Sequence, residues 1–400
     1  MSSAAPLKSA LGPAVRYNQK VIAMPQLVFG RTICLDSATI GKLSYDYCSN
    51  DPKRNQAAKH IMSWLVDHGL FILITFHHIE ELLQVEDERT VAERISLIKR
   101  LPVVVWPRRY DFSNGLGDIV DLISLEVEAI INSHSSTRQE IINIVKNDIL
   151  RYGSGEDLVT CQYDEWMLLR PHWIDRISKK RQIASITHSG ATNESVKLKE
   201  YRDRALRSKD EAFRITGLMA RKLGNELKVK GDEKLKNPDL VAREFMKHLF
   251  DTGLGIYDFD GDPIEGIFDI VGVDKSKITD EMTISQIGYL ATIQKKLEVA
   301  IRRVGINYND IKDRIYDNVP PSLFIDSEIE KASHSQQRGS GSNLNDRHIM
   351  GYAFYADFIE VDKRTLDSLD RVMRIHPVLK QMLGTVFRLK DYKELPNIVR

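Results

Sequence analysis

Five short runs of apolar, mostly branched residues alternate with stretches that have helical spacing. They lie at residues 32–35, 70–74, 102–107, 358–361 and 386–389. Continuous apolar runs of this length are typical of strands that are buried on both faces. Because strands that alternate with helices pair in parallel, the pattern predicts an α/β fold.

The strand pattern stops after the third run and resumes near the end of the chain. Charged, helix-forming sequence fills the interval, with helices expected at 118–132 and 138–152, and a polar linker-like stretch covers residues 333–345. The parts of the chain that we predict are a lead-in at 1–26, one α/β domain assembled from 27–113 and 336–400, and a mainly α-helical insert at 114–335.

Composition excludes several classes of protein. Of 400 residues, 42% are hydrophobic and 28% are charged, and the net charge is +1, as in ordinary globular proteins. No apolar run approaches the ~18–20 residues of a membrane span, and residues 1–20 lack the features of a signal peptide. Cys34, Cys48 and Cys161 form no CxxC pair, which indicates reduced thiols and a cytoplasmic location.

Acidic residues occur where the predicted strands end or where the next helix begins. Asp36 and Asp362 each follow a strand, Glu81 lies one turn into the helix after the second strand, and Asp346 opens the helix after the linker. Ligands of open α/β sheets bind at the carboxyl ends of the strands, so we expect these acids to meet there. Four converging carboxylates need a cation, and their hard oxygens suit Mg²⁺ or Mn²⁺. Such ions activate water against a phosphodiester.

Each acid also has an ordinary structural explanation. Asp36 is placed to cap a helix, Asp346 to cap or begin one, and Asp362 to pair with the basic residues that follow it. Glu81 is compatible with a solvated helix face. The order of the four acids along the chain is therefore more specific than any one of them.

Three segments resemble PIN-domain nucleases: Leu-Asp-Ser at 35–37, the Ile-Thr-Phe-His-His-Ile-Glu-Glu-Leu-Leu stretch at 74–83, and residues 345–365, the longest and most specific. The resemblance implies a three-layer α/β/α fold with a central parallel sheet and a carboxylate cluster that holds divalent metal. Members of that family commonly cleave RNA, often as toxins of toxin–antitoxin modules, and some relatives cut structured DNA.

The resemblance covers roughly residues 30–110 and 340–400, and compact PIN proteins have nothing like the long insert. The positions that match the catalytic, metal-binding residues of the family are Asp36, Glu81, Asp346 and Asp362. Glu80 matches less well than Glu81, and Asp357 is a weaker additional match.

A basic segment lies within the predicted insert. From Arg170 to Lys236 there are 18 Lys and Arg residues against 9 Asp and Glu residues. Contacts from such residues to phosphates give affinity for nucleic acid without sequence preference, although a solvated helix face is the usual alternative. The residues that we expect to bind nucleic acid are Lys179, Lys180, Arg181, Arg202, Arg204 and Arg207.

Together these features predict a metal-dependent endoribonuclease that acts as a toxin or an antiviral defence effector, with RNA favoured over DNA. The insert is expected to select the nucleic acid or to dock a regulatory protein. Two alternatives stay open. One is a DNA-cleaving PIN-like nuclease of phage defence, and the other is a catalytically inactive PIN-like protein that binds nucleic acid or serves as a scaffold. The oligomeric state is left open.

Overall fold

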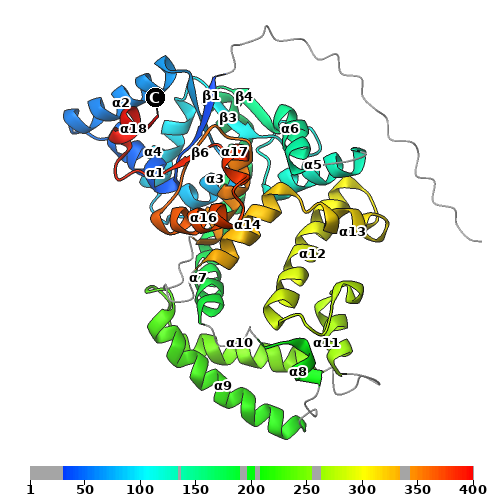
Figure 1. The fold of residues 1–400 in the computed structure, drawn as a ribbon. Coiled ribbons are helices and arrows are strands. Elements are labelled where there is room, and N and C mark those ends of the chain that lie inside the picture. The colour runs from blue at the N-terminus through cyan, green and yellow to red at the C-terminus, as the bar shows by residue number, and fades with distance from the viewer. Residues whose placement is uncertain are drawn as a thin grey trace, which may run out of the picture. The chain divides into compact units, whose positions relative to one another are not determined.

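A six-stranded mixed sheet contains strands from both ends of the chain in the computed structural model (Figure 1). The strands are β1 (Arg31–Cys34), β2 (Leu70–Leu73), β3 (Val104–Pro107), β4 (Leu150–Gly153), β5 (Phe358–Glu360) and β6 (Thr385–Phe387). Their spatial order is β4-β3-β2-β1-β5-β6. The predicted α/β class is thereby confirmed.

The structure describes residues 30–133, 137–189, 196–202, 208–254, 263–333 and 343–399. The predicted lead-in and most of the predicted linker lie outside these ranges, as do Arg204 and Arg207. The chain divides into two units, Met1–Gly30 and Arg31–Arg400, and every element named below belongs to the second unit.

Five of the six strands run in parallel, and β4 does not. β1 pairs in parallel with both β2 and β5, β3 continues the sheet beyond β2, and β6 continues it beyond β5. β4 lies antiparallel to β3, so the predicted parallel sheet is mixed instead. The predicted helix at 138–152 was wrong at its end, because α6 (Arg138–Ile149) stops where β4 begins. β4 is a half-buried edge strand, and such a strand carries no continuous apolar run.

Helices make up most of the remaining structure, and no helix in the described ranges is long and apolar enough to cross a membrane. Before β4 they are α1 (Ser37–Tyr47), α2 (Pro52–Asp67), α3 (Phe76–Leu83), α4 (Glu88–Lys99), α5 (Ile119–Asn132) and α6. Between β4 and β5 they are α7 (Gly155–His188), α8 (Leu198–Arg202), α9 (Lys209–Lys230), α10 (Pro238–Gly253), α11 (Pro263–Val271), the 3₁₀ helix η2 (Lys275–Lys277), α12 (Ile284–Val304), α13 (Tyr308–Asp317), α14 (Pro321–Ala332), α15 (Asn343–Met350) and the 3₁₀ helix η3 (Gly351–Phe354). After β5 they are α16 (Lys363–Ile375), α17 (Leu379–Met382), the 3₁₀ helix η4 (Tyr392–Glu394) and α18 (Leu395–Ile398).

Successive strand residues belong to two separate apolar clusters. Ile33 packs in one cluster with residues of α1, α2 and α3, and Cys34 packs in the other with residues of α5, α12 and α14. The neighbouring strands divide in the same way, since side chains along a strand alternate between the faces of a sheet. Burial of both faces explains the continuous apolar runs in the sequence. Helices from the predicted insert therefore share a core with the strands.

Candidate active site

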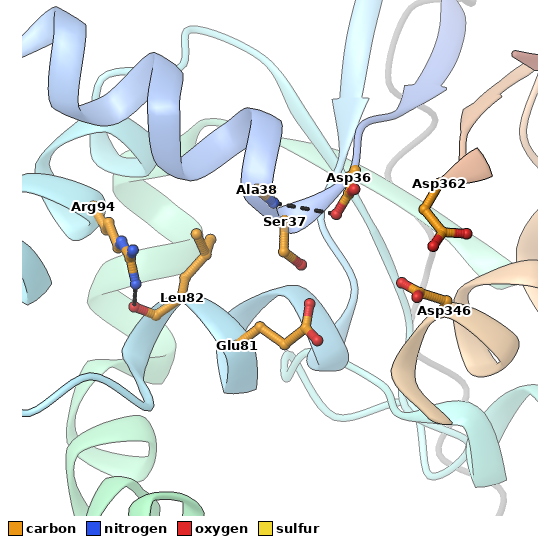
Figure 2. Close-up of a pocket in the computed structure, with 8 residues that line it drawn as sticks. All are labelled: Asp36, Ser37, Ala38, Glu81, Leu82, Arg94, Asp346 and Asp362. Carbon is orange, nitrogen blue, oxygen red and sulfur yellow. Dashed lines mark hydrogen bonds between the residues drawn. The ribbon is translucent and has the colours of Figure 1, made fainter. Parts of the chain in front are cut away.

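A cavity of about 300 Å³ lies where β1 and β5 end and α1 and α16 begin. The residues that line it are Asp36, Ser37, Ala38, Glu81, Leu82, Arg94, Asp346 and Asp362 (Figure 2). All four acids that the sequence marked as catalytic and metal-binding are in this set. They come from four separate places in the chain, so only the folded chain brings them together.

Asp36 and Asp362 are held in place by the helices that follow them. Oδ1 of Asp36 accepts a hydrogen bond from the Ala38 N–H at 3.1 Å, and Oδ1 of Asp362 accepts one from the Thr365 N–H at 2.7 Å. Each aspartate is thus the N-cap of a helix. The structural role considered for Asp36 from the sequence, that of a helix cap, is confirmed. A cap uses one carboxylate oxygen, which leaves Oδ2 of each residue for a ligand. None of the ion pairs between described residues includes Asp362.

Asp346 is the acid most affected by the others. Burial, followed by the negative charges of Asp362, Glu81 and Asp36, raises its pKa well above the ordinary value. Burial also raises the pKa of Asp36, the charge of Asp362 adds to this, and the hydrogen bond from Ala38 opposes it. The four carboxylates therefore lie within electrostatic reach of one another, and a bound cation would relieve their repulsion.

The neighbouring acid Glu80 belongs to a different environment. Its Oε1 lies 2.8 Å from Nζ of Lys180 and its Oε2 lies 3.6 Å from Nδ1 of His77. Although burial acts to raise the pKa of Glu80, the nearby His77 and the ion pair with Lys180 lower it to about 2. Glu81, not Glu80, lines the cavity.

Asp357, the weaker match, lies at the other end of β5. Its Oδ2 accepts hydrogen bonds from the backbone N–H of Thr32 at 2.7 Å and from the Thr32 hydroxyl at 3.0 Å. These contacts join the amino ends of β1 and β5. Asp357 is not among the residues that line the cavity.

Glu360, which the sequence did not mark as a site residue, holds the backbone of Asp36. Glu360 lies in β5 and is only 5% exposed. Its Oε2 accepts a hydrogen bond from the Asp36 N–H at 3.0 Å, and its Oε1 accepts one from the Thr39 hydroxyl at 2.8 Å. Burial raises the pKa of Glu360 to about 7. An acid inside an otherwise apolar strand was the available signal.

The predicted nucleic-acid-binding residues differ in how they are engaged. Lys179 is exposed on α7 and Arg181 is partly exposed, whereas Lys180 pairs with Glu80. Arg202 pairs with Glu265 at 2.8 Å and with Asp280 at 2.9 Å. The ion pairs of Lys180 and Arg202 therefore compete with any contact to a phosphate.

The acids of the cavity fit a divalent cation in their chemistry, because carboxylate oxygens are the ligands that Mg²⁺ and Mn²⁺ prefer. In the part of the chain that the structure describes, no three Asp, Glu, His or Cys side chains are arranged to hold a metal ion as they stand.

Comparisons with protein-family models, with curated proteins and with solved structures gave no match. The chemistry of the cavity residues is the basis for assigning a function.

Proposed function

We propose that this protein is a metal-dependent endoribonuclease whose PIN-like catalytic domain holds Mg²⁺ or Mn²⁺ through Asp36, Glu81, Asp346 and Asp362. The observation that carries the proposal is that these four acids line one cavity, where burial and the negative charges of the other three raise the pKa of Asp346. Acids that burial and like charges perturb in this way cluster at functional sites.

The fold supports the same proposal. Apolar clusters on opposite faces of the sheet favour a three-layer α/β/α arrangement. The cavity lies at the carboxyl ends of parallel strands, where open α/β sheets bind ligands. A site at this edge can draw side chains from several loops and helix starts, because all the parallel strands end there.

The residues of the chain have distinct tasks in this proposal. The cap hydrogen bonds of Asp36 and Asp362 fix one oxygen of each carboxylate and direct the carboxyl groups into the cavity. Glu360 holds the backbone of Asp36 and so fixes the start of α1. A bound divalent ion supplies charge that activates water and stabilises the leaving oxygen. Asp346 and Glu81 complete the anionic wall that attracts such an ion.

The proposed role of the helical insert is to contact the nucleic acid or to dock a regulatory protein. Among the predicted nucleic-acid-binding residues of α7, Lys179 is the exposed one and is therefore available for a phosphate contact. Removing its charge by Lys179→Met should weaken RNA binding, whereas a change at Lys180 would also break its ion pair with Glu80.

The proposal is tested by a cleavage assay on single-stranded RNA, single-stranded DNA and duplex DNA with Mg²⁺, Mn²⁺ or EDTA. Wild type should cleave RNA only with metal, and the double variant Asp36→Asn/Asp346→Asn should lose cleavage while remaining folded by circular dichroism. Asp67→Asn, an exposed acid at the end of α2, is the matched control and should cleave like wild type.

The other outcomes separate the alternatives. Cleavage of DNA in preference to RNA keeps the site and changes the substrate. Salt-sensitive binding of RNA without products, and without dependence on metal, would mean that the fold serves as a binding scaffold. Metal-dependent cleavage that survives in the double variant would remove the basis of the proposed site.

A further inference from the structure

The cavity has two chemically different ends. Figure 2 shows Asp346 and Asp362 together on one side and Arg94 on the other, beyond Leu82, with Ser37 between them. Of the described residues that line the cavity, Arg94 alone is basic. An anionic substrate that reaches the acids through a divalent cation would therefore extend toward a positive charge.

Arg94 is held in place but keeps most of its hydrogen-bonding capacity. One N–H of Nη1 donates to the carbonyl oxygen of Leu82 at 2.5 Å, and a Cβ on Gly41 of α1 would lie 3.5 Å from Nη2. Among described residues no carboxylate pairs with the Arg94 guanidinium, and Leu82 is its one hydrogen-bond acceptor. Burial lowers the pKa of Arg94, but an arginine keeps its charge at neutral pH. A fixed, half-buried cation with unused N–H groups results.

Ser37 provides a second, independent observation. It is the first residue of α1 and is 8% exposed, yet its hydroxyl has no hydrogen-bond partner in the described part of the chain. A buried polar group without a partner is rare in native proteins, and a missing water, ion or ligand commonly accounts for it. The Ser37 hydroxyl lines the same cavity as Arg94.

We infer that Arg94 and Ser37 form a subsite for a phosphate of the substrate strand, next to the phosphodiester that is cleaved. The inference rests on the proposed nuclease function and specifies what the site selects. A guanidinium donates two parallel N–H bonds to phosphate oxygens, and a serine hydroxyl donates a third. Because the acids face one phosphate and Arg94 the neighbouring one, the site prefers a nucleic-acid strand to an isolated phosphodiester.

The test compares two substrates in the presence of Mn²⁺: a short fluorescein-labelled RNA strand and bis(p-nitrophenyl) phosphate, which carries a single phosphodiester. For Arg94→Met, kcat/KM on the RNA should fall about tenfold to hundredfold, the range for loss of charged hydrogen bonds. On bis(p-nitrophenyl) phosphate, kcat/KM should stay close to the wild-type value. Arg94→Lys keeps the positive charge but not the paired N–H groups of the guanidinium, so its kcat/KM on RNA should lie between those of Arg94→Met and wild type.

Arg89→Met is the matched control, because Arg89 lies on the same helix with its side chain 78% exposed. Arg89→Met should leave kcat/KM unchanged on both substrates. A binding readout accompanies the kinetics: with Ca²⁺, which also prefers hard oxygen ligands, fluorescence anisotropy should show weaker RNA binding by Arg94→Met than by Arg89→Met.

Two results would overturn the subsite. In one, Arg94→Met lowers kcat/KM equally on both substrates, which means that Arg94 only supports the structure around Leu82. In the other, Arg94→Met leaves cleavage and binding of RNA unchanged. If wild type cleaves neither substrate, the proposed nuclease function fails as well, and the subsite fails with it.

Discussion

Two of the cavity acids, Asp36 and Asp362, cap the helices that follow strands, and Asp346 lies in the first turn of α15. Glu81 lies further along its helix, α3. The order of acids along the chain, together with the resemblance to PIN-domain nucleases, is what marked Asp36, Glu81, Asp346 and Asp362 in the sequence. Glu360 and Arg94 could not be selected in this way. The pattern of residues in a strand does not indicate which residues of a distant segment contact it. A charged residue on a helix also has the same sequence pattern whether its side chain faces solvent or a cavity.

The support that Glu360 gives to Asp36 predicts a cost for its removal. Glu360→Ala leaves the Asp36 N–H and the Thr39 hydroxyl without their partner at a buried position. The free energy of unfolding should fall by about 1–3 kcal/mol, measured by urea denaturation. Glu244→Ala, an exposed position on α10, provides the comparison. An unchanged midpoint for Glu360→Ala would show that water replaces the carboxylate.

A second buried acid, Glu126 of α5, predicts a pH dependence of stability. It is fully buried, and its carboxylate accepts hydrogen bonds from the Ser322 N–H at 3.1 Å and the Tyr355 hydroxyl at 2.6 Å. Burial raises its pKa from 4.5 to about 7. Glu126 therefore contributes its full stabilisation of the folded state below pH 4.5. This stabilisation is lost as the pH rises toward 7, because the Glu126 carboxyl group releases its proton more easily in the unfolded chain than in the folded one.

The difference between the two pKa values corresponds to about 3 kcal/mol. Glu126→Gln, which stays neutral, should remove this fall in stability and should unfold at a higher urea concentration than wild type at pH 8. Urea denaturation from pH 4 to pH 8 measures the effect. Parallel pH profiles for the two proteins would mean that Glu126 is already ionised in the folded state.

At the scale of helices and strands, the sequence predicted the elements that are strongly apolar or clearly capped. β1, β2 and β5 lie within one residue of their predicted bounds. β4 was missed because its four residues pair only at the sheet edge and are half-buried on both faces. The helix expected after the linker is divided between α15 and η3, a tightening of the last turn that residue spacing does not reveal.

Arg170 of α7 shows how one long helix holds the loop after α3. It is 8% exposed, its Nε donates to the Leu83 carbonyl at 3.0 Å, and its Nη2 donates to the Val85 carbonyl at 2.6 Å. Nη1 also pairs with Glu88 at 2.5 Å. The first arginine of the basic segment is thus a structural residue.

Arg170→Lys cannot reproduce this forked set of bonds and should lower the free energy of unfolding by about 1.5–3 kcal/mol. Amide hydrogen exchange should speed up in residues 83–88 more than elsewhere. Arg176→Lys, an exposed arginine on the same helix, should leave exchange unchanged. Equal exchange in Arg170→Lys and wild type would mean that the loop is held by other contacts.

For the whole molecule, the fold class followed from the sequence, but the boundary of the insert is less sharp than the pattern suggested. α5, α12 and α14 pack in the same apolar cluster as Cys34 of β1 and Leu73 of β2. The spacing of apolar residues indicates that a segment is helical, but it does not indicate which part of the protein the helix packs against. The packing of distant segments is therefore the part that a single sequence leaves out.

The repulsion among the cavity acids predicts a conflict between stability and the proposed metal site. Asp346→Asn removes one of four neighbouring carboxylates, so it should raise Tm in EDTA. Wild type, but not the variant, should gain about 2.7 kcal/mol of stability when Mn²⁺ is present at a hundred times its Kd. Thermal unfolding with and without Mn²⁺ measures both effects. Equal stabilisation of the two proteins would place the ion elsewhere.

Because β1 pairs with β5, the sheet and the cavity can form completely only late in synthesis of the chain. Thr32 bonds to Asp357, which is synthesised 325 residues later. Until then β1 has a partner on one side only, and the cavity lacks Asp346 and Asp362. A chain released early thus has an open sheet edge, which favours aggregation and degradation, and only half of the acidic cluster. The site can form only after the chain has been synthesised through Asp362.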